Sequence, residues 1–117
     1  MAVANVTQAK FLEVVSTGDI VVVDFFAKWC GPCKQFAPIF DDVSDKHSDV
    51  HFLKVDTDIE KQLSAEYEIS SIPTIVVLRE GRVVFKKAGA LTRASLEHLI
   101  RSVKELDMNQ VRAEKAM

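Results

Sequence analysis

The sequence predicts an α/β fold in which a mixed central β-sheet of about five strands is flanked by about four helices. Three observations lead to this prediction. Short runs rich in valine, isoleucine and phenylalanine alternate along the chain with segments of helical periodicity. The run over residues 20–27 is apolar on both alternating faces, which is typical of a central strand covered by helices. Late in the chain two strand-like runs flank a short turn, which predicts a hairpin and hence an antiparallel part of the sheet.

Length and charge narrow the class of protein. The chain has 117 residues, a formal charge of −2 and two cysteines. We expect one domain over residues 1–106, followed by an extension over 107–117 that forms a frayed helix. Two cysteines are too few for a disulfide-rich secreted scaffold, and the near-neutral charge gives no reason to expect nucleic acid as a partner. Without a basic leader or a long apolar run, the sequence favours a cytoplasmic protein with no membrane partner.

The first half of the chain alternates strand and helix. Val3–Val6 is a candidate strand, and Thr7 is a candidate N-cap for a helix that ends at Gly18. After the strand over residues 20–27, helical periodicity runs from Gly31 to about Lys46. The apolar positions expected to face the core are Phe11, Leu12 and Val15 in the first helix and Phe36, Ile39, Phe40 and Val43 in the second.

The second half completes the sheet. His51–Asp56 is a predicted strand, and Asp58 is a candidate N-cap for a short helix. Thr74–Leu78 and Arg82–Phe85 are the two arms of the predicted hairpin. A last helix starts near Thr92 and repeats apolar residues at the spacing of one buried face, namely Leu96, Leu99, Ile100 and Val103.

Both cysteines belong to the segment Trp29-Cys30-Gly31-Pro32-Cys33, where the central strand ends and a helix begins. The carboxyl edge of a sheet is where open α/β folds place their sites. The first-turn amides and the helix dipole stabilise a thiolate, so Cys30 at the helix start is the expected nucleophile. One helical turn brings Cys33 close enough to Cys30 to form a disulfide or to resolve a mixed one.

A zinc site is the alternative for a Cys-x-x-Cys pair. Zinc takes four ligands, and the chain has no second cysteine pair, while His47, His51 and His98 show no matching spacing. The acidic cluster Asp56, Asp58 and Glu60 is better explained by capping and solvation of a helix start. We therefore expect no metal and a redox motif.

Two charged residues lie near the motif. Asp24 sits in a strand expected to be buried on both faces, so its pKa should be raised, which suits a proton acceptor near neutral pH. A structural aspartate bound to a backbone donor is the alternative. Lys54 on the next strand either brings its ammonium toward Asp24 or reaches water past the sheet edge.

The segment Val23–Lys34, with Ile72-Pro73-Thr74 and Gly89-Ala90, resembles the active-site region and partner-facing loops of the thioredoxin family. The resemblance runs from about Val6 to Leu106. It implies the thioredoxin fold and a redox-active Cys30–Cys33 disulfide with no bound cofactor. It also implies that Asp24 handles the proton of Cys33, that Lys54 pairs with Asp24, and that Ile72-Pro73 is cis and lies against the cysteines.

The resemblance further implies partners. A substrate segment would pair with the Ile72 backbone by strand addition. Thioredoxin reductase would restore the dithiol with electrons from NADPH. The substrates would be disulfide-containing proteins, and the protein would act as a monomer. We expect Trp29 to be partly exposed rather than in the core. The residues expected to form an apolar docking rim are Trp29, Gly31, Pro32, Ile72, Pro73, Gly89 and Ala90.

Two other functions stay open on the sequence. One is an oxidase or isomerase of the protein disulfide isomerase type. The other is a binding subunit of a complex in which the thiols are incidental. Gly31-Pro32 favours the reducing activity by analogy with the family, and the absence of a recognisable leader agrees with it.

Overall fold

Five strands form one mixed sheet in the part of the chain that the structure describes, residues 2–116 of a computed structural model, with side chains described for residues 2–114. The strands are β1 (Val3–Asn5), β2 (Val21–Phe26), β3 (His51–Asp56), β4 (Thr74–Arg79) and β5 (Arg82–Ala88). Their order is β1-β3-β2-β4-β5, so β2 lies in the centre. β1, β3 and β2 are parallel, whereas β4 is antiparallel to β2 and β5, which confirms the predicted mixed sheet.

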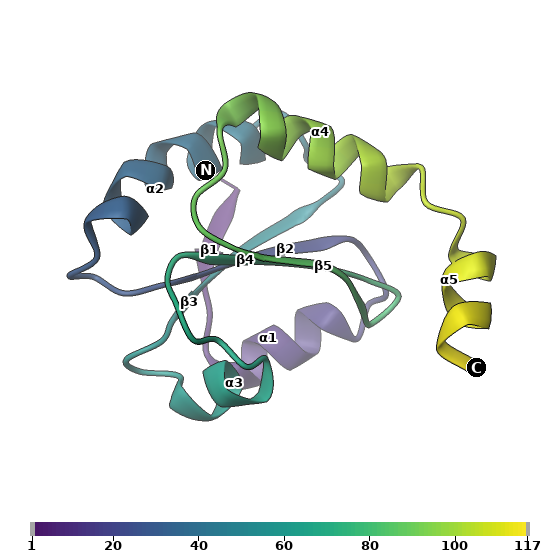
Figure 1. The fold of residues 1–117 in the computed structure, drawn as a ribbon, viewed down its shortest axis with the longest axis horizontal. Coiled ribbons are helices and arrows are strands. Elements are labelled where there is room, and N and C mark those ends of the chain that lie inside the picture. The colour runs from purple at the N-terminus through teal and green to yellow at the C-terminus, as the bar shows by residue number, and fades with distance from the viewer. Residues whose placement is uncertain (1, 117) are drawn as a thin grey trace.

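Helices cover both faces of this sheet. Figure 1 shows α2 (Gly31–Ser44) and α4 (Arg93–Lys104) on one side, and α1 (Gln8–Val15) and α3 (Lys61–Glu66) on the other. None of the helices in residues 2–116 is long and apolar enough to cross a membrane. The two layers create two apolar cores, one on each face of the sheet.

The central strand contributes to both cores. Val21, Val23 and Phe25 pack with α1 and α3, while Val22 packs under α2 and α4. Because side chains alternate along a strand, Asp24 shares the face of Val22. This buried carboxyl therefore lies in the layer that contains the helix with the cysteines.

Helix α1 differs from its prediction in which residues it buries. Thr7 caps it as expected, accepting a hydrogen bond from the Lys10 amide. The buried residues are Phe11 and Val14, whereas Leu12 is 54% exposed. The prediction that Leu12 faces the core is therefore wrong, because the position after Phe11 lies about 100° farther around the helix.

The chain continues past α4 into α5 (Met108–Ala116), which lies beside the β4–β5 turn in Figure 1. Met108 is buried, and Arg112 forms an ion pair with Glu80 in that turn. The Arg79 guanidinium donates to the Val103 carbonyl at the end of α4, 2.9 Å away. The predicted extension is helical over residues 108–116, and Met117 lies outside the described residues. The division of the chain into a domain and an extension stays a prediction.

Candidate active site

The two cysteines lie at the junction between β2 and α2. Cys30 is the N-cap of α2 and forms a disulfide with Cys33, with 5.2 Å between their Cα atoms. The Cys33 amide donates a hydrogen bond to Cys30 Sγ over 3.2 Å. Since the sulfur occupies the capping position at the positive end of the helix dipole, this geometry favours a thiolate on Cys30 when the disulfide is reduced.

A second loop approaches the disulfide from the start of β4. The Ile72–Pro73 peptide is cis, as the resemblance implied, and Pro73 is buried. Cys30 Sγ lies 3.8 Å from the Ile72 carbonyl oxygen. The Gly89 amide donates to the Pro73 carbonyl over 2.7 Å, and Gly89 has a φ of 100°, where a side chain would be strained. Cys30 thus contacts the Ile72–Pro73 loop, which is in turn bonded to Gly89.

Trp29 stands beside this junction on the surface. Its side chain is 70% exposed, and its indole Nε1 donates to Asp58 Oδ2 over 2.8 Å. The prediction that Asp58 caps the third helix is wrong, because its carboxylate is taken by Trp29 and α3 begins only after Glu60. Sequence reasoning missed the pairing. A signal for it was present, since Trp29 and Asp58 follow the ends of two neighbouring parallel strands.

Asp24 is fully buried, on the same face of β2 as Val22. Neither of its carboxyl oxygens has a hydrogen-bond partner among the described residues. Burial raises the pKa of Asp24 from 3.8 to about 7, and the positive charge of Lys54 opposes part of this rise. A carboxyl group with this pKa can gain or lose a proton near neutral pH. The alternative interpretation, a structural aspartate bound to a backbone donor, does not apply, since no such donor contacts Asp24 among the described residues.

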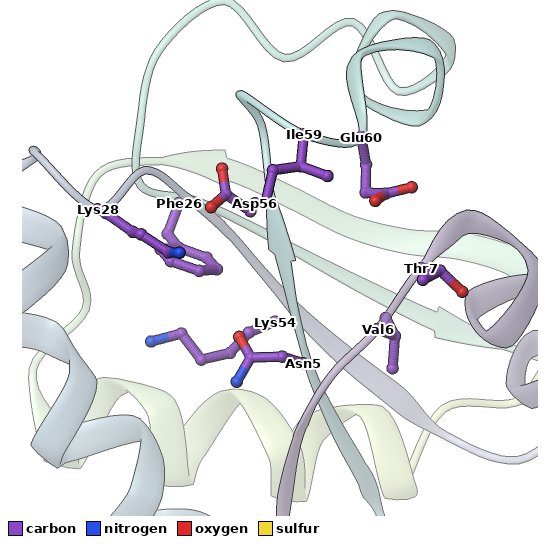
Figure 2. Close-up of a pocket in the computed structure, with 9 residues that line it drawn as sticks. All are labelled: Asn5, Val6, Thr7, Phe26, Lys28, Lys54, Asp56, Ile59 and Glu60. Carbon is purple, nitrogen blue, oxygen red and sulfur yellow. The ribbon is translucent and has the colours of Figure 1, made fainter.

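Lys54 is directly opposite Asp24 in the register of β2 and β3. Its ammonium lies 4.4 Å from the centre of the Phe26 ring, an arrangement visible in Figure 2. None of the ion pairs within the described residues joins Lys54 to Asp24, so the direct pair expected from the resemblance is not present. The ring attracts the cation, and the charge of Lys54 still acts on Asp24.

The remaining metal candidates are engaged elsewhere. Asp56 accepts the amide of Asp58, and Glu60 accepts the amide of Gln8 at the start of α1. His47 contacts Glu97, 2.9 Å away, on the α2–α4 side. Within residues 2–116, no group of three or more His, Cys, Asp or Glu side chains could hold a metal ion.

A groove of about 400 Å³ opens between β1, β3 and the loop before α3. Figure 2 shows Phe26 and Lys54 on one side of it and Ile59 and Glu60 on the other. Ile59, which the sequence did not single out, is 65% exposed.

A thioredoxin family model matches residues 2–102, which span both cysteines, the cis-proline loop and Gly89. The chain belongs to the thioredoxin family. It is 41% identical over 108 residues to a putative thioredoxin 2 of Streptomyces coelicolor, covering 92% of this chain and 81% of that protein. It is 42% identical over 94 residues to a thioredoxin of Mycoplasmoides gallisepticum, covering 80% and 94%.

Solved thioredoxin structures have the same fold. The structure of Plasmodium falciparum thioredoxin superposes with a TM-score of 0.79 at 37% identity, over 85% of this chain and 97% of that one. The predicted thioredoxin fold is therefore confirmed, with a fifth helix within the described residues. As a thioredoxin-family member with a redox-active Cys30–Cys33 disulfide, the chain is a thiol–disulfide oxidoreductase, and dithiol–disulfide exchange by this family needs no cofactor.

Proposed function

We propose that the chain is a protein-disulfide reductase in which Cys30 is the nucleophile and Cys33 the resolving thiol. The observation that carries this assignment is the hydrogen bond from the Cys33 amide to Cys30 Sγ at the start of α2. It stabilises negative charge on Cys30, whereas Cys33 lies one turn inside the helix. This difference supports Cys30 as the attacking sulfur and Cys33 as the resolving one.

The reaction transfers two electrons from the dithiol to a target disulfide. The Cys30 thiolate attacks one target sulfur, the target S–S bond breaks, and the other target sulfur leaves as a thiolate. The Cys33 thiolate then attacks Cys30 Sγ in the mixed disulfide. This second step forms the Cys30–Cys33 disulfide and releases the reduced target.

Asp24 serves as the proton acceptor for Cys33 in the second step. Its pKa of about 7 keeps an ionised fraction available at neutral pH, and it lies on the sheet face that packs under α2. Since neither Asp24 carboxyl oxygen has a hydrogen-bond partner among the described residues, we assign the transfer to a bridging water molecule. Lys54 assists by favouring the ionised form of Asp24 from its place over Phe26.

Target proteins dock on the surface around Cys30. The exposed Trp29, Gly31 and Pro32 form one side of it, and Ile72, Pro73, Gly89 and Ala90 form the other. An extended target segment adds to the Ile72 backbone as a strand, and main-chain hydrogen bonds then supply most of the affinity. The protein therefore accepts many different disulfide proteins, because few side chains of the target take part in recognition.

Thioredoxin reductase, which reduces members of this family, returns the oxidised protein to the dithiol form. NADPH is then the source of electrons, and the protein acts as a monomer in the cytoplasm, where thiols are kept reduced. No nucleic acid or membrane takes part.

A coupled assay tests the proposal. NADPH oxidation is followed with a thioredoxin reductase and a disulfide protein substrate, for the wild type, Cys30→Ser and Cys33→Ser. We expect turnover only for the wild type. Undiminished turnover by Cys30→Ser would refute the mechanism, and an equilibrium potential in the range of oxidases would favour an oxidase or isomerase instead.

A further inference from the structure

Three lysines line a hollow whose wall includes Cys33. Lys28 precedes Trp29, Lys34 follows Cys33 in the first turn of α2, and Lys54 comes from β3. They line a hollow of about 230 Å³, here called the Cys33 pocket, together with Phe26, Ala37 and Cys33. Its wall thus includes the resolving cysteine but none of Ile72, Pro73 and Gly89, which form the docking side.

The positive charge of the Cys33 pocket is not neutralised by neighbouring carboxylates. Among the ion pairs of the described residues, none involves Lys28, Lys34 or Lys54. Of the acidic groups nearby, Asp24 is buried with a pKa raised to about 7, and Asp56 lines the neighbouring groove rather than this pocket. The pocket therefore has an excess of positive charge.

One of the lysines, Lys54, is positioned by an aromatic ring. The Lys54 ammonium is held 4.4 Å from the centre of the Phe26 ring, and the exposed Lys28 lines the same pocket, labelled beside Phe26 in Figure 2. Phe26, Lys28 and Lys54 also line the larger groove beside β1. A cation held against an aromatic ring loses less freedom when it binds an anion than a fully mobile lysine does.

Lysine ammonium groups bind phosphate as point charges. A hollow of about 230 Å³ has room for a tetrahedral oxyanion. We propose that the Cys33 pocket binds a small oxyanion of the phosphate class, free or as part of a phosphorylated metabolite, and that the bound anion slows the resolving step.

The effect on the resolving step rests on the proposed function. The charge of Lys54 lowers the pKa of Asp24, and a bound anion would offset that charge. Asp24 would then hold its proton to higher pH and accept the proton of Cys33 less readily. Lys28 and Lys34, which line the same hollow, would hold the anion near Lys54.

Binding is tested on the oxidised protein, which needs no redox activity. Inorganic phosphate is titrated at pH 7.5 and constant ionic strength while amide NMR signals of Ala27, Cys33, Lys34 and Ala37 are followed. We expect saturable shifts with a dissociation constant on the order of 1 mM. The double variant K28Q/K34Q should lose saturation, whereas K87Q, which removes an exposed lysine of β5, should keep it. Linear shifts, or equal shifts in K28Q/K34Q, mean an adventitious ion only and overturn the proposal.

The regulatory part is tested by the rate at which a preformed mixed disulfide on Cys30 is resolved. Saturating phosphate should move the pH midpoint of this rate upward by about half a pH unit in the wild type and leave Asp24→Asn unchanged. Binding without this shift overturns the regulatory part. Failure to resolve the mixed disulfide in phosphate-free buffer would instead refute the proposed function, while the binding result would stand.

Discussion

Replacing Asp24 by Asn should make the protein more stable at neutral and alkaline pH. Asp24 is fully buried, and neither carboxyl oxygen has a hydrogen-bond partner among the described residues. Ionising it in this site is costly, which is why its pKa is raised from 3.8 to about 7. Asn has nearly the same shape and cannot ionise, so the substitution removes the cost without leaving a large cavity.

The size of the effect follows from the two pKa values. Between pH 3.8 and about 7 the folded protein holds a proton on Asp24 that the unfolded chain has lost. The stability gained from this proton is complete below pH 3.8 and is lost as the pH rises through 7. At about 1.4 kcal/mol per pKa unit, the wild type should lose up to about 4 kcal/mol relative to Asp24→Asn between pH 4 and pH 8.

Urea unfolding of the oxidised proteins at several pH values measures this difference, since cysteines in a disulfide do not titrate. Glu66→Gln provides a control, because it makes the same chemical change at an exposed residue of α3. The difference between wild type and Asp24→Asn should grow with pH, and that between wild type and Glu66→Gln should stay nearly constant. A pH-independent difference for Asp24→Asn would refute the argument that Asp24 is a buried group titrating near pH 7.

Three further substitutions test other parts of the structure. Thr92→Ala removes the side-chain N-cap of α4 and should lower the free energy of unfolding by about 1 kcal/mol in urea titrations. The hydrogen bond from His47 lowers the pKa of Glu97, so stability tied to this carboxylate is present above pH 4.5 and lost below it. The free energy of unfolding should therefore fall less steeply below pH 4.5 in Glu97→Gln than in the wild type. Equally steep falls would contradict this. Asp58→Ala removes the acceptor of the Trp29 indole and should raise KM for a protein disulfide about fivefold with little change in kcat; an unchanged KM would show that the contact does not position Trp29 for docking.

Much of the fold could be predicted because apolar periodicity reports burial directly. The run over residues 20–27 is apolar on both faces, and the central strand β2 is buried on both. The spacing of Leu96, Ile100 and Val103 likewise matched the buried face of α4. Leu12 was misassigned because neighbouring apolar residues fit more than one helical stripe, and only the position of the sheet selects between them.

The cysteine pair could be placed from sequence because strand, turn and helix follow one another within a few residues. Contacts between distant segments could not be placed in this way. The choice of Asp58 between capping a helix and accepting the Trp29 indole depends on how two parallel strands end side by side. The choice of Lys54 between Asp24 and Phe26 depends on distances of a few ångströms that no spacing encodes.

The central claim is that Cys30 attacks and Cys33 resolves, and trapping the mixed disulfide tests it most directly. Cys33→Ser and Cys30→Ser are each reduced, mixed with a disulfide-containing protein, and analysed by intact mass and peptide mapping. The mechanism predicts a persistent adduct on Cys30 of Cys33→Ser and little adduct on Cys30→Ser. A persistent adduct on Cys33 of Cys30→Ser, with none on Cys33→Ser, would contradict it.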